Sequence, residues 1–295
     1  MTVTRPVVVG LDGSKSATHA VRWAAEEAAR RNTGLVITHS CVLLPARTLD
    51  LIAPAESYAD GVLDEGRQWL AEAATAARKA APQVEVRTEL AAGDAAEQLV
   101  GRSTSACLLV LGSHGRGGFT GLLAGSTAVA VTTHAHCPVV VVRNTEADPP
   151  SDAPVVVGLD GSPASDAALA FAFEAAAVRG VALHAVRTWW DITAETAWQR
   201  GLTATNLASI EAAERRLLAE QVAARSAVHP DVPVQQILTR DRPAHTLVKQ
   251  SANAQLIVVG TRGRGGFRGL LLGSTGQALI HHAHCPVSVV PLTQQ

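Results

Sequence analysis

The feature that most constrains this chain is an internal repeat with a constant spacing. The octet VVVGLDGS occupies residues 7–14 and returns 148 positions later, at 155–162. A repeat this long is one domain written twice, because solenoid repeats have periods of only about 20–50 residues. The same shift relates Gly112 to Gly260, Cys137 to Cys285, RGGF at 116–119 to 264–267, and HAHCPV at 134–139 to 282–287.

The repeat predicts two domains joined by a short linker. A chain of 295 residues suits two domains of ordinary size better than one core. The stretch NTEADPPSDAP, at 144–154, is rich in Pro, Asp and Ser, as exposed connections are. The predicted division is a first domain over 1–145, a linker over 146–154 and a second domain over 155–295.

Within each copy, short apolar runs alternate with amphipathic stretches. The apolar runs of the first copy lie at 7–11, 35–40, 84–90, 107–112 and 138–142. The helical patterns between them lie near 14–32, 61–81 and 94–104, with a stretch that has no clear pattern over 42–60. Short Val/Ile/Leu-rich runs separated by helices indicate βαβ units and a parallel sheet covered on both faces. Each copy is therefore predicted to be a doubly wound, five-stranded α/β domain.

The composition excludes several classes of protein. With 47% hydrophobic and 17% charged residues the chain is globular, and its net charge of −1 offers no attraction to nucleic acid or to an anionic membrane. No uninterrupted apolar run reaches the roughly 18 residues of a membrane span. The first strand begins a few residues after Met1, so we expect no signal peptide. The four cysteines form no CxxC pair, and we expect them to be reduced thiols of a cytoplasmic protein.

A Gly-rich loop is the second repeated feature. GSHGRGGFTGLLAGST occupies 112–127 and GTRGRGGFRGLLLGST occupies 260–275. Each loop follows a buried strand and leads into a helix, at the edge where doubly wound sheets bind ligands. Glycines let backbone N–H groups approach an anion, and the helix N-terminus adds unpaired donors. The loop therefore suits a polyphosphate, although turns of this kind also occur as purely structural elements.

These motifs together resemble the universal stress protein family, in its tandem, ATP-binding form. The resemblance rests on the strand ending in Asp, the pattern G-2x-G-9x-G-[ST] and the Cys-Pro before the last strand, and it covers about 7–143 and 155–291. It implies an adenine nucleotide alpha hydrolase-like fold with strand order 3-2-1-4-5 and one ATP site per domain. Such an order places the ends of strands 1 and 4 beside the topological switch point.

The resemblance also implies a role for each matching residue. In the first copy Asp12 contacts the adenosine end, Gly112 lies along the ribose, and Gly115 and Arg116 meet the phosphates. Ser40 lies beside adenine, where the family usually has a small apolar residue. The expected binding residues are Asp12, Ser40, Gly112, Gly115, Arg116, Gly125, Ser126 and Thr127 in the first copy, and Asp160, Thr188, Gly260, Gly263, Arg264, Gly273, Ser274 and Thr275 in the second.

The two expected sites differ in charge. His114 of the first copy is replaced by Arg262 in the second, and Thr120 by Arg268. The second copy should therefore present more positive charge to phosphate, and we expect the two sites to differ in affinity.

Two other motifs have competing interpretations. HAHC, at 134–137 and 282–285, contains zinc-ligand residue types, but consecutive residues send their side chains in different directions, which favours a structural role. Trp189, Trp190 and Trp198 could stack on adenine or line a partner surface, and a hydrophobic loop anchor is the simpler interpretation. No metal site and no catalytic residue is predicted.

Three functions of different classes remain open at this point. The first is an ATP-binding regulatory stress-response protein, with Mg²⁺ held through the phosphates and a regulatory protein partner that the sequence does not identify. The second is a slow ATPase or phosphoryl-transfer enzyme that uses the same sites, for which the chain shows no group that clearly orients a nucleophile. The third is an assembly module. The resemblance also implies a homodimer that pairs through the last strands.

Overall fold

The computed structural model describes residues 5–42, 55–115, 125–143, 149–189, 204–263 and 272–292. The side chains of 55–57 and 204–206 lie outside that description. The chain divides into two compact units, Met1–Asn144 and Thr145–Gln295, which are described separately below.

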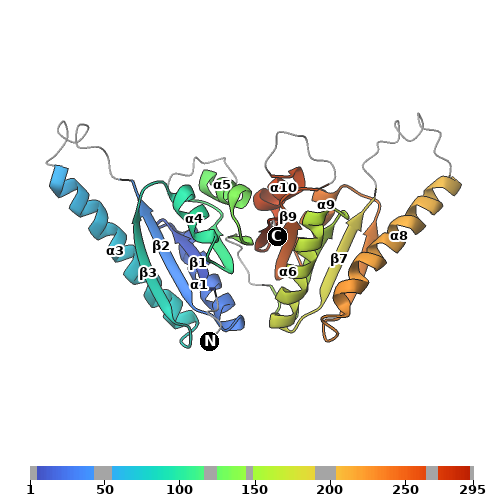
Figure 1. Ribbon diagram of the computed structural model, residues 1–295, viewed down its shortest axis with the longest axis horizontal. Coiled ribbons are helices and arrows are strands. Elements are labelled where there is room, and N and C mark those ends of the chain that lie inside the picture. Colours follow the sequence, from blue (N-terminus) through green and yellow to red (C-terminus); the bar gives the residue numbers. More distant parts are fainter. Residues whose placement is uncertain are drawn as a thin grey trace. The chain divides into compact units, whose positions relative to one another are not determined.

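The first unit is built on a parallel sheet with the strand order β3-β2-β1-β4-β5. Figure 1 shows β3, β2 and β1 of this sheet side by side. Its strands are β1 (Val7–Leu11), β2 (Leu35–Cys41), β3 (Val86–Ala92), β4 (Leu108–Gly112) and β5 (Val139–Val142). Its helices are α1 (Lys15–Arg30), α3 (Ala55–Ala80), α4 (Ala95–Ser103) and α5 (Ser126–His134) among the described residues.

The second unit repeats this arrangement, with the strand order β8-β7-β6-β9-β10. Its strands are β6 (Val155–Leu159), β7 (Leu183–Thr188), β8 (Val234–Thr239), β9 (Leu256–Gly260) and β10 (Val287–Val290). Its described helices are α6 (Pro163–Arg179), α8 (Ala204–Ser226), α9 (Pro243–Ser251) and α10 (Ser274–His282). The predicted α/β class with a parallel sheet is confirmed in both units.

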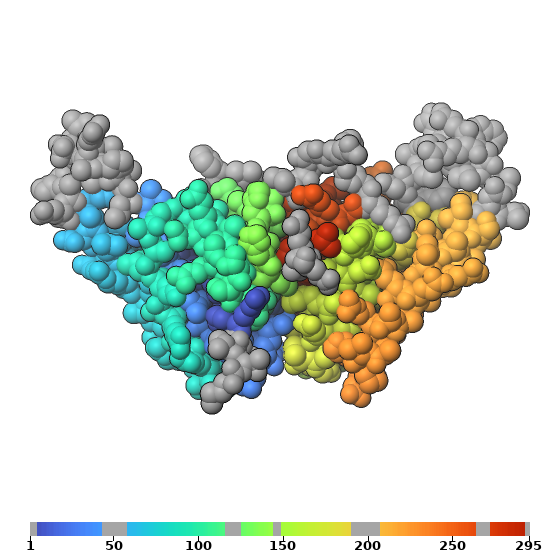
Figure 2. Space-filling model, in the orientation of Figure 1, coloured from blue at the N-terminus to red at the C-terminus, as the bar shows by residue number. Residues whose placement is uncertain are grey.

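Helices cover both faces of each sheet. In the first unit α1 packs beside α3, and α4 packs beside α5, as the neighbouring teal and green surfaces show in Figure 2. In the second unit α6 packs beside α8 and α9 beside α10. Because both faces are covered, the central strands β1 and β4 are continuous runs of buried residues: Val7–Val9 and Leu108–Leu111 are all buried.

The order of the strands determines where a ligand site can form. β4 pairs with β1 on the side opposite β2, so the chain leaves β1 and β4 in different directions at the same edge of the sheet. In the second unit β6 and β9 have the same relationship. Each unit therefore has a topological switch point at the carboxyl ends of these two strands.

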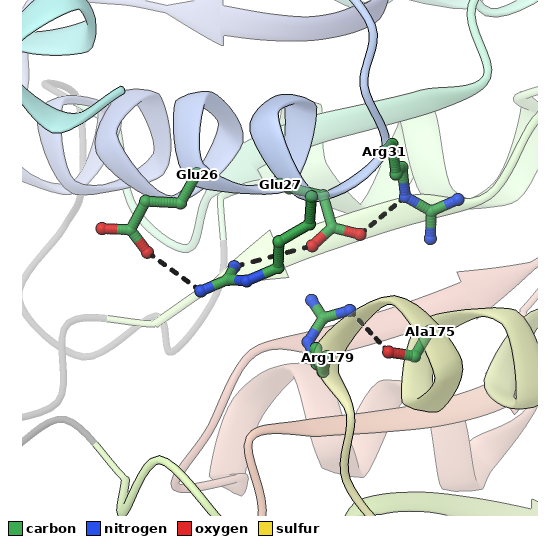
Figure 3. Close-up of polar contacts among 6 residues, drawn as sticks. Glu26, Glu27, Arg31, Ala175 and Arg179 are labelled. Carbon is green, nitrogen blue, oxygen red and sulfur yellow. Dashed lines mark hydrogen bonds and ion pairs between the residues drawn. The ribbon is translucent and has the colours of Figure 1, made fainter. Parts of the chain in front are cut away.

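The last turn of α1 contains a buried ion pair between Glu27 and Arg31, and the residue equivalent to Glu27 in the second unit is Ala175. Glu27 is fully buried, and its Oε1 accepts a hydrogen bond from Arg31 Nε at 2.6 Å, as Figure 3 shows. At the equivalent place in α6, Arg179 Nη1 donates to the carbonyl of Ala175 at 3.0 Å. A carboxylate removed from water is stabilised by such pairing, so Glu27 requires Arg31 where Ala175 requires no partner.

Candidate functional site

The turn that leaves β1 holds Asp12 in a defined conformation. Asp12 Oδ1 accepts a hydrogen bond from Ser14 N at 3.0 Å, and Gly13 between them has φ +77°. Ser14 is the N-cap of α1, and its hydroxyl accepts from Ala17 N at 3.1 Å. Each residue of the Asp-Gly-Ser turn therefore has a local role: the aspartate accepts a hydrogen bond from the Ser14 N–H, the glycine adopts the left-handed conformation, and the serine caps the helix.

The second unit forms the same turn from the same residues. Asp160 Oδ1 accepts from Ser162 N at 2.9 Å, and Gly161 has φ 76°. Ser162 caps α6 by accepting from Ser165 N at 3.2 Å. The repeated octet therefore encodes a repeated geometry, and it orients one carboxylate in each unit.

The end of β4 meets this turn, although it is about a hundred residues away in sequence. Ser14 Oγ donates to the carbonyl of His114 at 3.3 Å, and His114 N donates to Ser16 Oγ at 3.4 Å. A Cβ placed on Gly115 would lie 2.7 Å from Asp12 Oδ2, so the carboxylate is packed against that glycine. Gly263 and Asp160 are in the same close contact in the second unit. The ends of strands 1 and 4, predicted to lie beside one topological switch point, therefore do come together.

Gly112 and Gly260 have a packing reason to be glycine. A Cβ on Gly112 would lie 2.6 Å from Ser16 Oγ and 2.9 Å from Ala17 N, in the first turn of α1. A Cβ on Gly260 would lie 2.7 Å from the backbone of Ala164 in α6. The end of the strand can pass the helix only without a side chain, so packing within the unit is sufficient to explain glycine at these two positions.

Gly125 and Gly273 have no such reason among the described residues. Gly125 N donates to Ser113 O at 3.0 Å, and a Cβ on Gly125 would come no closer than 3.8 Å to its described neighbours. Both glycines are N-caps in ordinary extended conformation, and no described side chain caps α5 or α10. A Cβ on Gly125 would lie 3.8 Å from the N of Gly115, the glycine that packs against Asp12, so the start of α5 is close to the Asp-Gly-Ser turn. The first N–H groups of α5 and α10 have no described side-chain acceptor, and an anion could accept their hydrogen bonds.

The remaining predicted residues lie around this centre or outside the described part of the chain. Leu11 pairs with His39, and Leu159 with Arg187, so Ser40 and Thr188 are level with the two aspartates. Ser126 and Ser274 begin α5 and α10, and Thr127 and Thr275 follow in the first turn. Residues outside the description are Arg116, Arg264, Thr120, Arg268, Trp190 and Trp198.

The HAHC segments join a helix to the last strand in both units. His136 N donates to Ser103 Oγ at 2.9 Å, and His284 N donates to Ser251 Oγ at 2.8 Å. Burial raises the pKa of the Cys137 thiol to about 12, which keeps it protonated at neutral pH. In the described part of the chain, no group of three or more His, Cys, Asp or Glu side chains is arranged to hold a metal ion. Of the three tryptophans considered above, the structure describes Trp189, and its ring centroid lies 5.9 Å from Cζ of Arg240.

Sequence reasoning missed the support beneath Asp12. His39 in β2 and Trp69 in α3 pack under the β1–α1 turn, and neither belongs to a motif. The one sequence signal is that a bulky imidazole, His39, stands at a buried position near the end of β2. Ser16 was missed as well, because its contact with His114 is visible only once β4 is placed beside α1.

Comparisons with known proteins agree with this fold. The model of the universal stress protein family matches residues 4–143 and 153–291. A universal stress protein of Mycobacterium tuberculosis strain H37Rv is 40% identical over 288 residues, which cover 96% of each chain. One from Mycolicibacterium smegmatis is 35% identical over 296 residues, again with 96% of each chain covered.

A solved structure has the same architecture across the whole chain. The crystal structure of a universal stress protein from Archaeoglobus fulgidus superposes with a TM-score of 0.71 at 20% identity, and covers 98% of this chain and 99% of its own. Among the described residues, no helix is both long enough and apolar enough to cross a membrane. The two family matches, one in each unit, show that the chain belongs to the universal stress protein family and carries two of its domains.

Proposed function

We propose that each unit binds one ATP at the edge where β1 and β4, or β6 and β9, end, and that the protein acts as an ATP-dependent regulator in a stress response. The observation that carries the proposal is the uncapped helix N-terminus beside an oriented aspartate, present in both units. Helix N–H groups bind phosphate, and a carboxylate accepts hydrogen bonds from a ribose or a base, so the pair suits the two ends of a nucleotide.

Several further elements belong to the same proposal. Mg²⁺ would be held through the phosphates, as it commonly is at nucleotide sites. The cytoplasm as location, a homodimer and a regulatory protein partner follow from the composition and the family resemblance. Slow ATP hydrolysis at the same sites is the alternative function. It would be detected as phosphate released when ATP is incubated with the full chain.

Gly125 and Gly273 offer the sharpest test of the phosphate position. Gly125→Ala adds a methyl group that meets its described neighbours at ordinary contact distances, so the fold should tolerate it. If phosphate approaches the backbone there, we expect ATP affinity at the first unit to fall about tenfold or more. Gly273→Ala should do the same at the second unit. Isothermal titration of the nucleotide-free full chain measures both.

Gly101→Ala is the matched control for these variants. Nothing lies within 4 Å of a Cβ on Gly101, which is in α4. It changes the same residue type without touching the site, and ATP affinity should be unchanged. Wild-type affinity in the chain that carries both Gly125→Ala and Gly273→Ala would show that phosphate does not bind at these helix N-termini.

A further inference from the structure

His39 is hydrogen-bonded to the residue that precedes Asp12. It lies in β2 with only 8% of its surface exposed, and its Nδ1 is 2.7 Å from the carbonyl oxygen of Leu11. A carbonyl only accepts, so Nδ1 is the donor. Because the peptide bond is planar and trans, fixing the Leu11 carbonyl also fixes the N–H of Asp12, which points away from His39. The imidazole therefore sets the orientation of the peptide that enters the Asp-Gly-Ser turn.

Trp69 supports the same turn from α3. Its ring is edge-on to His39, with a centroid distance of 5.1 Å and an interplanar angle of 79°. Its ring carbons lie 2.8–3.1 Å from the place where a Cβ would stand on Gly13. His39 has room for its ring because residue 66 is glycine: a Cβ on Gly66 would lie 2.8 Å from His39 Cδ2. His39 of β2 and Gly66 and Trp69 of α3 thus form one packed cluster under the turn, which we call the bracket.

The second unit replaces every member of this bracket. Arg187 stands at the position of His39 and is 2% exposed, and Glu214 stands at the position of Gly66. Arg187 Nε and Glu214 Oε2 are 2.5 Å apart. Leu217, at the position of Trp69, is 41% exposed. The turn is the same in both units, but His39 and Trp69 pack against it in the first unit, whereas an ion pair occupies the positions of His39 and Gly66 in the second.

We propose that His39 and Trp69 are positioning residues of the first nucleotide site, and that they set its affinity independently of the second. This inference rests on the proposed function. His39 and Trp69 act through the Leu11–Asp12 peptide and Gly13, and they orient the Asp12 N–H and carboxylate. The two sites therefore respond separately to changes beneath them.

The test compares His39→Phe, which keeps a ring but removes the donor, with His39→Gln, whose amide N–H can replace it. Trp69→Leu introduces the residue of the second unit. Each full chain is photolabelled with increasing 8-azido-ATP, at a temperature at which circular dichroism shows it folded. Mass spectrometry then quantifies labelled peptides from residues 1–144 and from 145–295 separately. The second unit serves as an internal control in the same tube.

We expect His39→Phe and Trp69→Leu to weaken labelling of the first unit about tenfold, and His39→Gln to weaken it less than about threefold. Labelling of the second unit should be unchanged. A loss of stability alone would lower the melting temperature without changing the half-saturation of the folded chain. Equal half-saturation of wild type, His39→Phe and Trp69→Leu in the first unit would overturn the inference. Absence of saturable labelling in both units of the wild type would instead overturn the proposed function.

Discussion

At the scale of single residues, the glycines of the repeated loop serve different purposes. Gly112 makes room for α1, and Gly115 makes room for Asp12. No described residue would be crowded by a Cβ on Gly125, so packing within the unit does not explain why this residue is glycine. A bound ligand that approaches the backbone there would explain it. The letters of the motif were readable from the sequence. Their separate roles were not, because each depends on which element packs against the glycine.

His184 should make stability depend on pH. Its Nδ1 is buried without a hydrogen-bond partner among the described residues, and burial lowers the pKa of its imidazole. The unfolded chain therefore binds the proton more readily than the folded one. The stability contribution is complete above the unfolded pKa of about 6.5 and is lost as the pH falls below it.

Replacement by valine, the residue at the equivalent position 36, tests this account. His184→Val should remove part of the decrease in unfolding free energy between pH 7 and pH 5. Urea denaturation at several pH values measures it, with His19→Gln as the control because His19 is exposed and lies in α1. An identical pH profile in wild type and His184→Val would contradict the assignment.

At the scale of elements, strands with strong apolar runs were predicted closely and the surface helices less so. β1 is found at the predicted residues, because a buried parallel strand must be continuously apolar. α3 begins at Ala55, inside the stretch over 42–60 that showed no pattern, because polar residues such as Glu56 obscure its start. β3 begins two residues later than predicted, since as the half-exposed outer strand of its unit it carries a weaker apolar signal.

The first unit has His39 and Gly66 where the second has Arg187 and Glu214, so substitutions at residues 39 and 66 should have non-additive effects on the free energy of unfolding. His39→Arg alone buries a charge without its partner, and it should lower the unfolding free energy by about 3 kcal/mol or more. Gly66→Glu alone forces a side chain against His39 and should also destabilise, by about 1–3 kcal/mol. The double variant recreates the Arg187–Glu214 pair of the second unit.

A double-mutant cycle with chemical denaturation measures this coupling. We expect the double variant to be more stable than the sum of the single effects by about 2 kcal/mol. Simple additivity would mean that the two units support their turns in unrelated ways.

At the scale of the whole molecule, the two units share some structural features and differ in others. Both units keep the strand order, the Asp-Gly-Ser turn and the uncapped helix after the loop. They differ beneath the turn and at the second residue after β4, where His114 corresponds to Arg262. The two-domain organisation and the candidate site were accessible from the sequence because the repeat aligns the chain with itself. The bracket was not, since packing from α3 leaves no motif.

The central claim is that each unit binds a nucleotide. Isothermal titration of ATP with Mg²⁺ into the nucleotide-free full chain tests it most directly. The account predicts saturation at two ATP per chain, with the second unit tighter because Arg262 is a permanent cation. Saturation at one ATP per chain, or no binding heat at millimolar ATP, would contradict it.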